Sequence, residues 1–194
     1  MTQDSQANCG IPASCQREIP TWLVLLDNIP TAVMFLLGAA ILWQVGWPLS
    51  LLFLLYCAAA IVLFWGRICP YCHHFGTRAC PCGYGMMAKR FFHPKPATPG
   101  KDFRSVFRRN IGIMFPCWFV PLVAGIALLF NRSSAPLLTL FVSFCVVGFV
   151  LIPMISILVG CRACEIKEDC PWMTKKQKPE GTIRPGHPPS PSAK

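Results

Sequence analysis

The segment 67-RICPYCHHFGTRACPCGYG-85 decides how this chain folds, because it places four cysteines and two histidines directly after a long apolar run. A second segment, 161-CRACEIKEDCPW-172, follows another apolar run. Each segment has a C-x-x-C pair at the exit of the hydrophobic stretch and a Cys-Pro a few residues later. This arrangement predicts that membrane helices hold two cysteine clusters at one face of a bilayer.

The apolar stretches around these segments have the length of membrane spans. Of the 194 residues, 54% are hydrophobic and only 13% are charged, and the mean hydropathy is +0.48. A transmembrane helix needs roughly 17–25 predominantly apolar residues. We therefore expect an all-α membrane protein whose four spans, 22–43, 49–65, 111–130 and 135–160, form two antiparallel hairpins.

The stretches between the spans set the expected domain organisation. Residues 1–21 form a polar tail, 22–65 the first hairpin, 66–110 a basic cysteine-rich loop, and 111–160 the second hairpin. The remaining 161–194 begins with cysteines and becomes Pro-rich, which predicts disorder toward its end. Within the loop, 101–109 predicts a short amphipathic helix in the headgroup layer, with its arginines near anionic lipid.

Basic residues are distributed unevenly between the two sides of the predicted spans. The middle loop holds nine Lys or Arg and the C-terminal tail seven, against none and one in the two short turns. Because short cytoplasmic loops are enriched in Lys and Arg, this distribution places the loop and both termini in the cytoplasm, at the cytoplasmic (inner) membrane. The net charge of +10 is then explained by topology, and no nucleic-acid partner is expected.

The cysteines of both segments are candidate metal ligands, because thiolates bind soft metals and iron–sulfur clusters. Cys9 and Cys15 in the polar tail are either spare ligands or free surface thiols. If the second and fourth spans end at the same face, their cysteine motifs can converge on a shared site. The predicted ligands are Cys69, Cys72, Cys80, Cys82, Cys161, Cys164 and Cys170, with His73 and His74 as possible additional ligands.

Other chemical groups lie inside the predicted spans. Asp27 is a functional candidate, since an ionisable group within a membrane span is costly unless it is used or shielded. The alternative is that Asp27 lies at headgroup depth and faces the helix bundle. Cys57, Cys117 and Cys145 are expected to act as small apolar packing residues.

The residues 64-FWGRIC-69, followed by 80-CPCG-83, resemble the Gly-Arg…Cys…Cys-Pro…Gly signature of membrane-bound polyferredoxin-type proteins, the NapH-like and NosR-like electron-transfer subunits. The resemblance implies 4Fe-4S clusters on cytoplasmic Cys-Pro motifs, and electron transfer together with other membrane or redox subunits. The gap between Cys and Cys-Pro is longer here than in that family. The number of clusters and the partners therefore stay open.

Three other interpretations fit parts of the same motif. Structural zinc would pin the cytoplasmic loops to the bundle without catalysis. A thiol–disulfide oxidoreductase would use Cys69 and Cys72, which stand in a tetrapeptide resembling that of glutaredoxins, with Arg67 stabilising the thiolate. The C-x-x-C-H spacing also matches covalent haem attachment, which the cytoplasmic topology disfavours. No motif for hydrolysis is present.

Reporter fusions test the topology. A fluorescent protein fused after Lys95 should fluoresce and alkaline phosphatase fused there should be inactive, because the basic loop is expected in the cytoplasm. Fusions after Arg132 should give the opposite pattern. Phosphatase activity at Lys95 would place the cysteines outside and restore the haem interpretation.

Overall fold

The computed structural model describes residues 18–96, 98, 103–132 and 134–161, and helices are the only regular structure in that part of the chain. Four helical stretches are long and apolar enough to cross a membrane: Thr21–Trp43, Trp47–Tyr71, Phe103–Asn131 and Ala135–Leu158. These stretches confirm the all-α membrane fold with four spans. The elements are α1 (Thr21–Trp43), α2 (Trp47–Arg67), η2 (Cys69–Tyr71), α3 (Tyr84–Phe91), α4 (Phe103–Asn110), η3 (Ile111–Met114), α5 (Pro116–Asn131), α6 (Ala135–Cys145), η4 (Val146–Leu151), α7 (Ile152–Ile155) and η5 (Ser156–Cys161).

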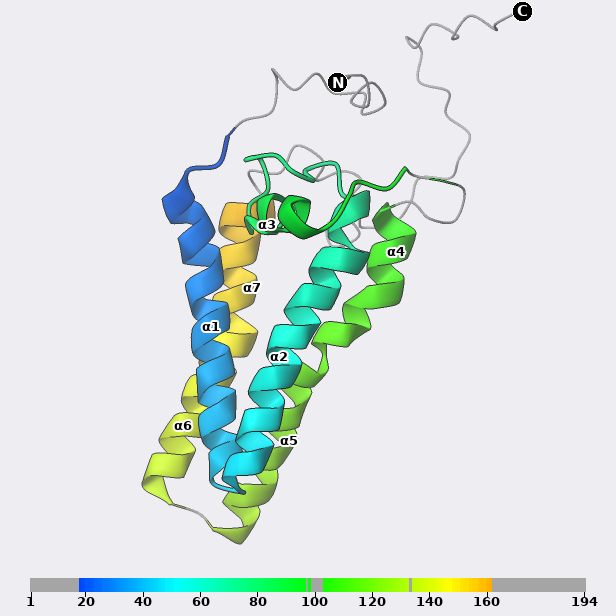
Figure 1. The fold of residues 1–194 in the computed structure, drawn as a ribbon. Helices are drawn as coiled ribbons and strands as arrows, with labels where there is room; N and C mark the ends of the chain where they lie inside the picture. The colour runs from blue at the N-terminus through cyan, green and yellow to red at the C-terminus, as the bar shows by residue number, and fades with distance from the viewer. Residues whose placement is uncertain (1–17, 97, 99–102, 133, 162–194) are drawn as a thin grey trace, which may run out of the picture.

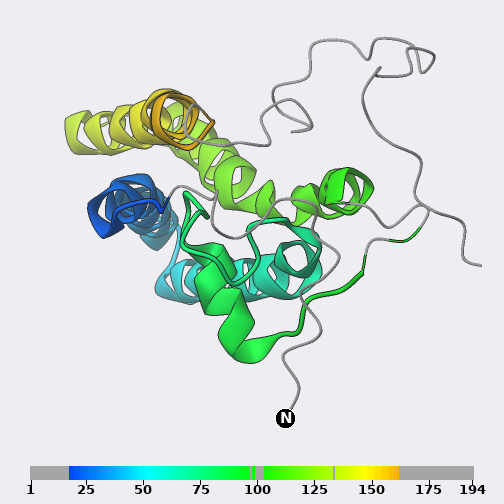
Figure 2. The ribbon, with the colours of Figure 1, turned by 90° about the horizontal axis from the view of Figure 1, so that it is seen from above.

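Helix α1 packs against α2, α5 and α6 in the bundle (Figures 1 and 2). A short turn after Trp43 joins α1 to α2, where Pro48 occupies the first helical turn, a position that needs no backbone N–H donor. Inside the bundle, the Ser50 hydroxyl donates a hydrogen bond to the Ala39 carbonyl at 2.8 Å. This buried bond satisfies the hydroxyl where no water can reach it.

The bundle has an apolar interior and an equally apolar outer surface. Met34, Ile41 and Phe144 are fully buried between the helices. In contrast, Leu36 and Val123 point outward and are 64% and 63% exposed. An apolar surface of this extent requires a lipid environment, because soluble proteins rarely expose large contiguous apolar patches.

The third and fourth spans differ in detail from their predicted forms. Helix α4 forms where an amphipathic helix was expected, but it runs on through η3 into α5 along the bundle axis instead of lying across its end (Figure 1). The fourth span alternates between α-helical and π-helical turns. Pro153 lies within it, in the first turn of α7, and its missing N–H accounts for part of this irregularity.

The cysteine loop and α3 gather at one end of the bundle, the end that η5 also reaches (Figures 1 and 2). The backbones of Cys69 and Cys161 therefore lie at the same end, as the two-motif layout predicts. Cys164, Cys170, His187 and the Pro-rich tail lie outside the described residues, as do Cys9 and Cys15.

Three spans approach one another closely at Gly38. A Cβ at Gly38 would lie 2.8 Å from Cγ of Pro121 and 3.0 Å from the Phe53 ring. Gly112, by contrast, has nothing within 4 Å of a built Cβ. The two glycines thus offer a matched pair for testing the packing.

We expect Gly38→Ala to destabilise the bundle by roughly 1–3 kcal/mol, because the methyl group must displace Pro121 or Phe53. Gly112→Ala should be neutral or stabilising, since alanine restricts the unfolded chain more than glycine. Unfolding in mixed micelles, followed by circular dichroism, measures both. Equal effects of the two substitutions would contradict this packing.

Candidate functional site

The C-x-x-C pair forms where α2 ends. Helix α2 stops at Arg67, and the short helix η2 follows with Pro70 in its first turn. The Cys72 N–H donates to the Cys69 carbonyl at 2.9 Å, which turns the chain and holds both cysteines on the same short loop. Cys69 is buried, whereas Cys72 is half-buried.

The chain then folds back on itself and brings Cys80 to the same place. Gly76 N–H donates to the Gly85 carbonyl at 3.1 Å, and Gly85 N–H points at the Cys80 sulfur at 3.4 Å. A side chain at Gly85 would collide with the His74 carbonyl, so only glycine allows this approach. Gly83 supports the fold by adopting a φ of +70° at the start of α3, a conformation that favours glycine.

Helix α1 anchors this loop to the bundle. The Asn28 amide donates to the Cys82 carbonyl at 3.0 Å and to the Val24 carbonyl at 2.7 Å. Further along the loop, Ile19 N–H donates to the Arg78 carbonyl at 3.0 Å. Asn28 was not among the predicted site residues, although its position beside Asp27 near the start of the first span was a usable signal.

Asp27 faces the bundle and connects three elements of the structure. Its carboxylate accepts a hydrogen bond from the Ser156 hydroxyl of η5 at 3.2 Å and lies close to the Cys82 thiol. Burial raises the pKa of the Cys82 thiol well above its ordinary range, and the negative charge of Asp27 raises that pKa further.

An aromatic wall closes the site on the side of α2. The Tyr84 ring packs edge-on against Phe64 and Trp65, with ring centroids 5.9 and 6.0 Å apart. Burial raises the pKa of the Tyr84 hydroxyl, and the nearby Cys82 and Asp27 add to that effect. The indole N–H of Trp65 is buried without an acceptor among the described residues.

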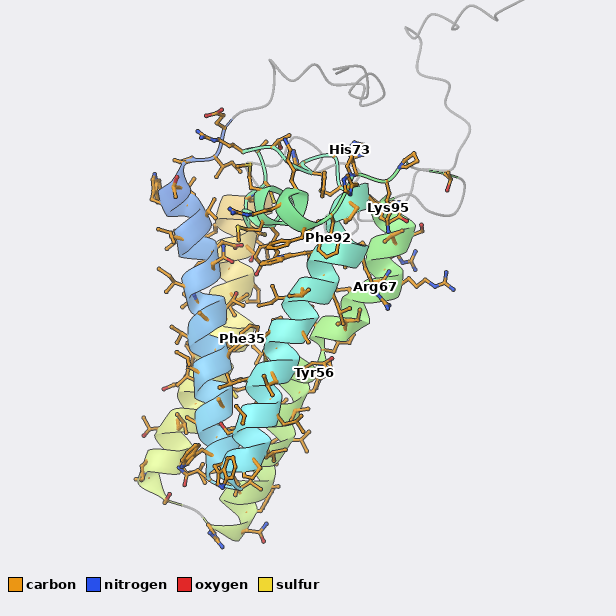
Figure 3. The ribbon with its side chains drawn as sticks, viewed as in Figure 1. Phe35, Tyr56, Arg67, His73, Phe92 and Lys95 are labelled. Atoms are coloured by element: carbon orange, nitrogen blue, oxygen red, sulfur yellow. The ribbon has the colours of Figure 1, made fainter. Side chains whose placement is uncertain are left out.

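The structure places some of the predicted ligands and leaves others undescribed. Cys69, Cys72, Cys80 and Cys82 gather in one loop, since Cys69 lies within electrostatic reach of Cys72, Cys80 and Cys82. His73 is exposed, and Figure 3 shows it at the outer edge of the loop; His74 is buried. The side chains of Cys161, Cys164 and Cys170 fall outside what the structure describes.

The gathered thiols do not form a finished metal site. Within the described part of the chain, no group of three or more His, Cys, Asp or Glu is arranged to hold a metal ion. None of the cysteines whose side chains the structure describes is in a disulfide bond. The loop thus brings four sulfurs to one end of the bundle without setting them around a common centre.

Two further cysteines meet inside the membrane-spanning bundle. The Cys57 and Cys117 sulfurs lie 3.6 Å apart, and both residues are buried between α2 and α5. Cys145 lies half-buried in the fourth span. Cys57 and Cys117 belong to the apolar core, in agreement with the packing role expected for them.

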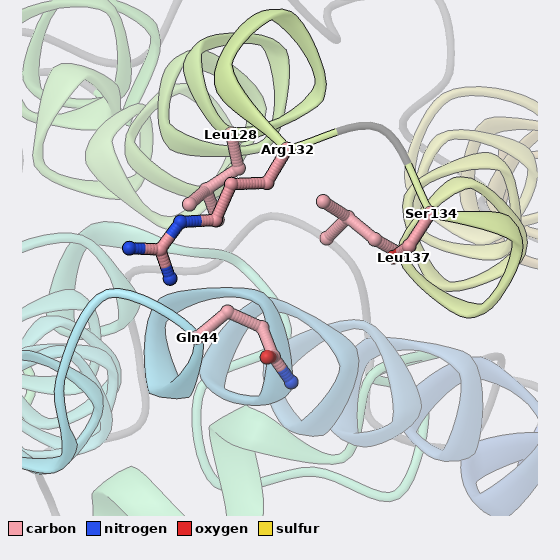
Figure 4. A pocket seen from close by; sticks show the side chains of 5 residues that line it. All are labelled: Gln44, Leu128, Arg132, Ser134 and Leu137. Carbon is pink, nitrogen blue, oxygen red and sulfur yellow. The ribbon is translucent and has the colours of Figure 1, made fainter.

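A small pocket lies at the opposite end of the bundle from the cysteine loop. Its volume is about 290 Å³, and Figure 4 shows the Arg132 guanidinium on one side and the Gln44 amide on the other. It has no thiol, imidazole or carboxylate in its lining. The five lining residues are Gln44, Leu128, Arg132, Ser134 and Leu137.

The fold and the site together define an all-helical, multi-pass membrane protein with a cysteine-rich loop fastened to one end of its bundle. No family model, curated protein or solved structure matches the chain.

We expect Asp27→Asn to speed alkylation of Cys82 several-fold near pH 8.5, about the ordinary thiol pKa. Removing the carboxylate charge lowers the pKa of Cys82 and so raises its thiolate fraction. Peptide-resolved mass spectrometry of metal-free protein after iodoacetamide pulses reads this out. Ser156→Ala is the control, because it keeps the charge and removes only the hydroxyl; an equal acceleration there would point to loosened packing instead.

Proposed function

We propose that this protein is an integral membrane electron carrier that binds an iron–sulfur cluster, of the 4Fe-4S type, through the cysteines of its loop. The observation that carries the proposal is the convergence of Cys69, Cys72, Cys80 and Cys82 at one end of the bundle. Four thiols are the complement that such a cluster requires. The resemblance to polyferredoxin-type subunits supports the same assignment.

The surroundings of the thiols suit a sulfur-rich group. Gly85 brings a backbone N–H to the Cys80 sulfur, and buried Trp65 offers an indole N–H that has no acceptor in the described residues. Donors of this kind stabilise charge on cluster sulfurs and tune the reduction potential. The apolar wall of Phe64 and Tyr84 limits access of water on one side.

A bound cluster would supply one-electron transfer, and the residues of this chain would hold it in place. Cys69, Cys72, Cys80 and Cys82 are the ligands proposed for the first site. Cys161, Cys164 and Cys170 are proposed to provide a second site or to share the first, with His73 or His74 as possible substitutes. Asn28 and Asp27 keep the loop against α1, so that the site stays at a fixed position relative to the membrane.

Thiol–disulfide exchange at Cys69 and Cys72 is the second candidate function, favoured by the C-x-x-C spacing of these two cysteines. Burial raises the pKa of the Cys69 thiol to about 12, with Cys80 and Cys72 adding to the effect, which argues against Cys69 as the nucleophile because the thiolate is the reactive form. A thiol with a raised pKa needs a compensating positive charge to ionise, and a metal supplies that charge. Structural zinc fits the same donor set and gives a different experimental signature.

The setting of the proposed function is the cytoplasmic face of the inner membrane. The basic loop supports that orientation, through the preference of cytoplasmic loops for Lys and Arg. Only a small part of the described chain lies outside the spans, so the electron donor and acceptor are proposed to be other membrane or redox subunits.

Anaerobic purification with absorption spectroscopy and metal analysis separates the candidates. We expect brown protein with a broad band near 400 nm that bleaches on reduction, as a cluster with thiolate ligands requires. Colourless protein with stoichiometric zinc would favour the structural site, since the filled d-shell of zinc has no redox chemistry. Colourless protein without metal would leave thiol exchange as the function.

Substitution of Cys80 then tests the ligand set. Cys80→Ser should remove most of the bound iron and the absorption band, because Cys80 lies outside the C-x-x-C pair and would be needed only by a metal. Cys145→Ser, in the fourth span, should leave both unchanged. Retention of metal in Cys80→Ser would exclude Cys80 as a ligand, and unaltered disulfide exchange in that variant would support the alternative function.

A further inference from the structure

A basic pocket lies beside the C-x-x-C turn, and Tyr71 of that turn lines it. A pocket of about 310 Å³ opens between the end of α2, the stretch after α3, and α4. Three cationic side chains line it, Arg67, Lys95 and Arg109, together with the polar residues Tyr71, Ser105 and Asn110. Figure 3 shows Arg67 and Lys95 at this end of the bundle.

The three cations come from separate parts of the chain and are held near one another by the fold. Arg67 is the last residue of α2. Lys95 is placed by its backbone N–H, which donates to the Pro70 carbonyl at 2.9 Å, and its ammonium lies 5.8 Å from the centre of the Tyr71 ring. Preceding Lys95, the Phe92 ring packs on Gly66, where a Cβ would come within 2.9 Å.

Helix α4 presents the third cation from the opposite side. Its Phe107 is buried and packs edge-on against Phe64 of α2, with ring centroids 6.5 Å apart. This contact fixes the rotation of α4. Ser105 and Arg109, one helical turn apart, both line the pocket as a result.

The charge of the pocket is unbalanced within the described structure. Arg78 forms an ion pair with Glu18 elsewhere in the structure. Among the described residues, no carboxylate forms an ion pair with Arg67, Lys95 or Arg109. Bringing three positive charges together costs electrostatic energy, which a bound anion would reverse. Arginine also binds phosphate oxygens in a bidentate manner, and lysine adds a point charge.

We propose that this pocket binds a phosphate group, and that the group belongs to an anionic phospholipid headgroup. Its position supports the lipid source, because Arg67 directly follows the last apolar turn of a membrane span and Trp65 lies two residues earlier, where interfacial aromatic residues occur. Basic pockets between transmembrane helices are known to bind such headgroups. The pocket adjoins the C-x-x-C turn, because Tyr71 lies between Cys69 and Cys72.

Native mass spectrometry of the full-length protein tests the proposal. In detergent titrated with phosphatidylglycerol, the wild type should retain this lipid in preference to phosphatidylcholine. The triple variant R67Q/K95Q/R109Q should bind phosphatidylglycerol at least about tenfold more weakly, because charge-assisted hydrogen bonds are lost. The three side chains are exposed, and thermal unfolding checks that the variant keeps its fold.

A matched control removes the same charge from the same end of the protein. The variant K89Q/R90Q/R108Q alters three exposed cations that do not line the pocket, and it should bind the lipid as the wild type does. If both triple variants lose phosphatidylglycerol binding equally, the lipid binds to a diffuse basic surface and the proposed pocket is not its binding site. The single variant R109Q gives the same comparison with a smaller loss if the triple variant does not fold.

Inorganic phosphate distinguishes the source of the ligand. Added at millimolar concentration, it should compete only weakly with phosphatidylglycerol, because the lipid is also held by its acyl chains. Tight binding of inorganic phosphate with no preference among lipids would overturn the lipid source. If the protein neither binds inorganic phosphate nor prefers phosphatidylglycerol to phosphatidylcholine, the proposed phosphate site is wrong.

Discussion

The attachment of the cysteine loop to α1 is the contact on which the rest of this end of the molecule depends. Asn28 holds the loop through the Cys82 carbonyl, and Asp27, which lies close to the Cys82 thiol, accepts a hydrogen bond from Ser156 of the last span. Two neighbouring residues of α1 therefore join the first span, the loop and the fourth span. Without them the loop would be tethered mainly by the end of α2, and its thiols would have no fixed place relative to the bundle.

The same end of the bundle carries two polar features. On the side facing α1, the Asp27 carboxylate lies close to the Cys82 thiol. The side facing α4 gathers Arg67, Lys95 and Arg109, which favours an anion. Aromatic packing of Phe64, between Tyr84 and Phe107, separates the two sides.

The sequence predicted the four spans because apolar length is a direct consequence of bilayer thickness. It also indicated that Asp27 could face the bundle, which the structure shows. It did not predict α3, whose formation depends on Gly83 in a left-handed conformation and on tertiary contacts of Tyr84. The roles of Ser156 and Trp65 could not be predicted either, because each depends on which distant segment lies opposite.

The wide turns of the fourth span have a geometric consequence. A π-helical turn is an α-helical turn that contains one additional residue, so each one rotates the remainder of the helix relative to a regular α-helix. The span contains two such stretches, η4 before Ser156 and η5 from Ser156 onward. The direction in which the Ser156 side chain faces is therefore set by an extra residue several positions earlier in the helix. A one-residue deletion in η4 would turn the Ser156 hydroxyl away from Asp27, although no residue that contacts Asp27 would have been replaced.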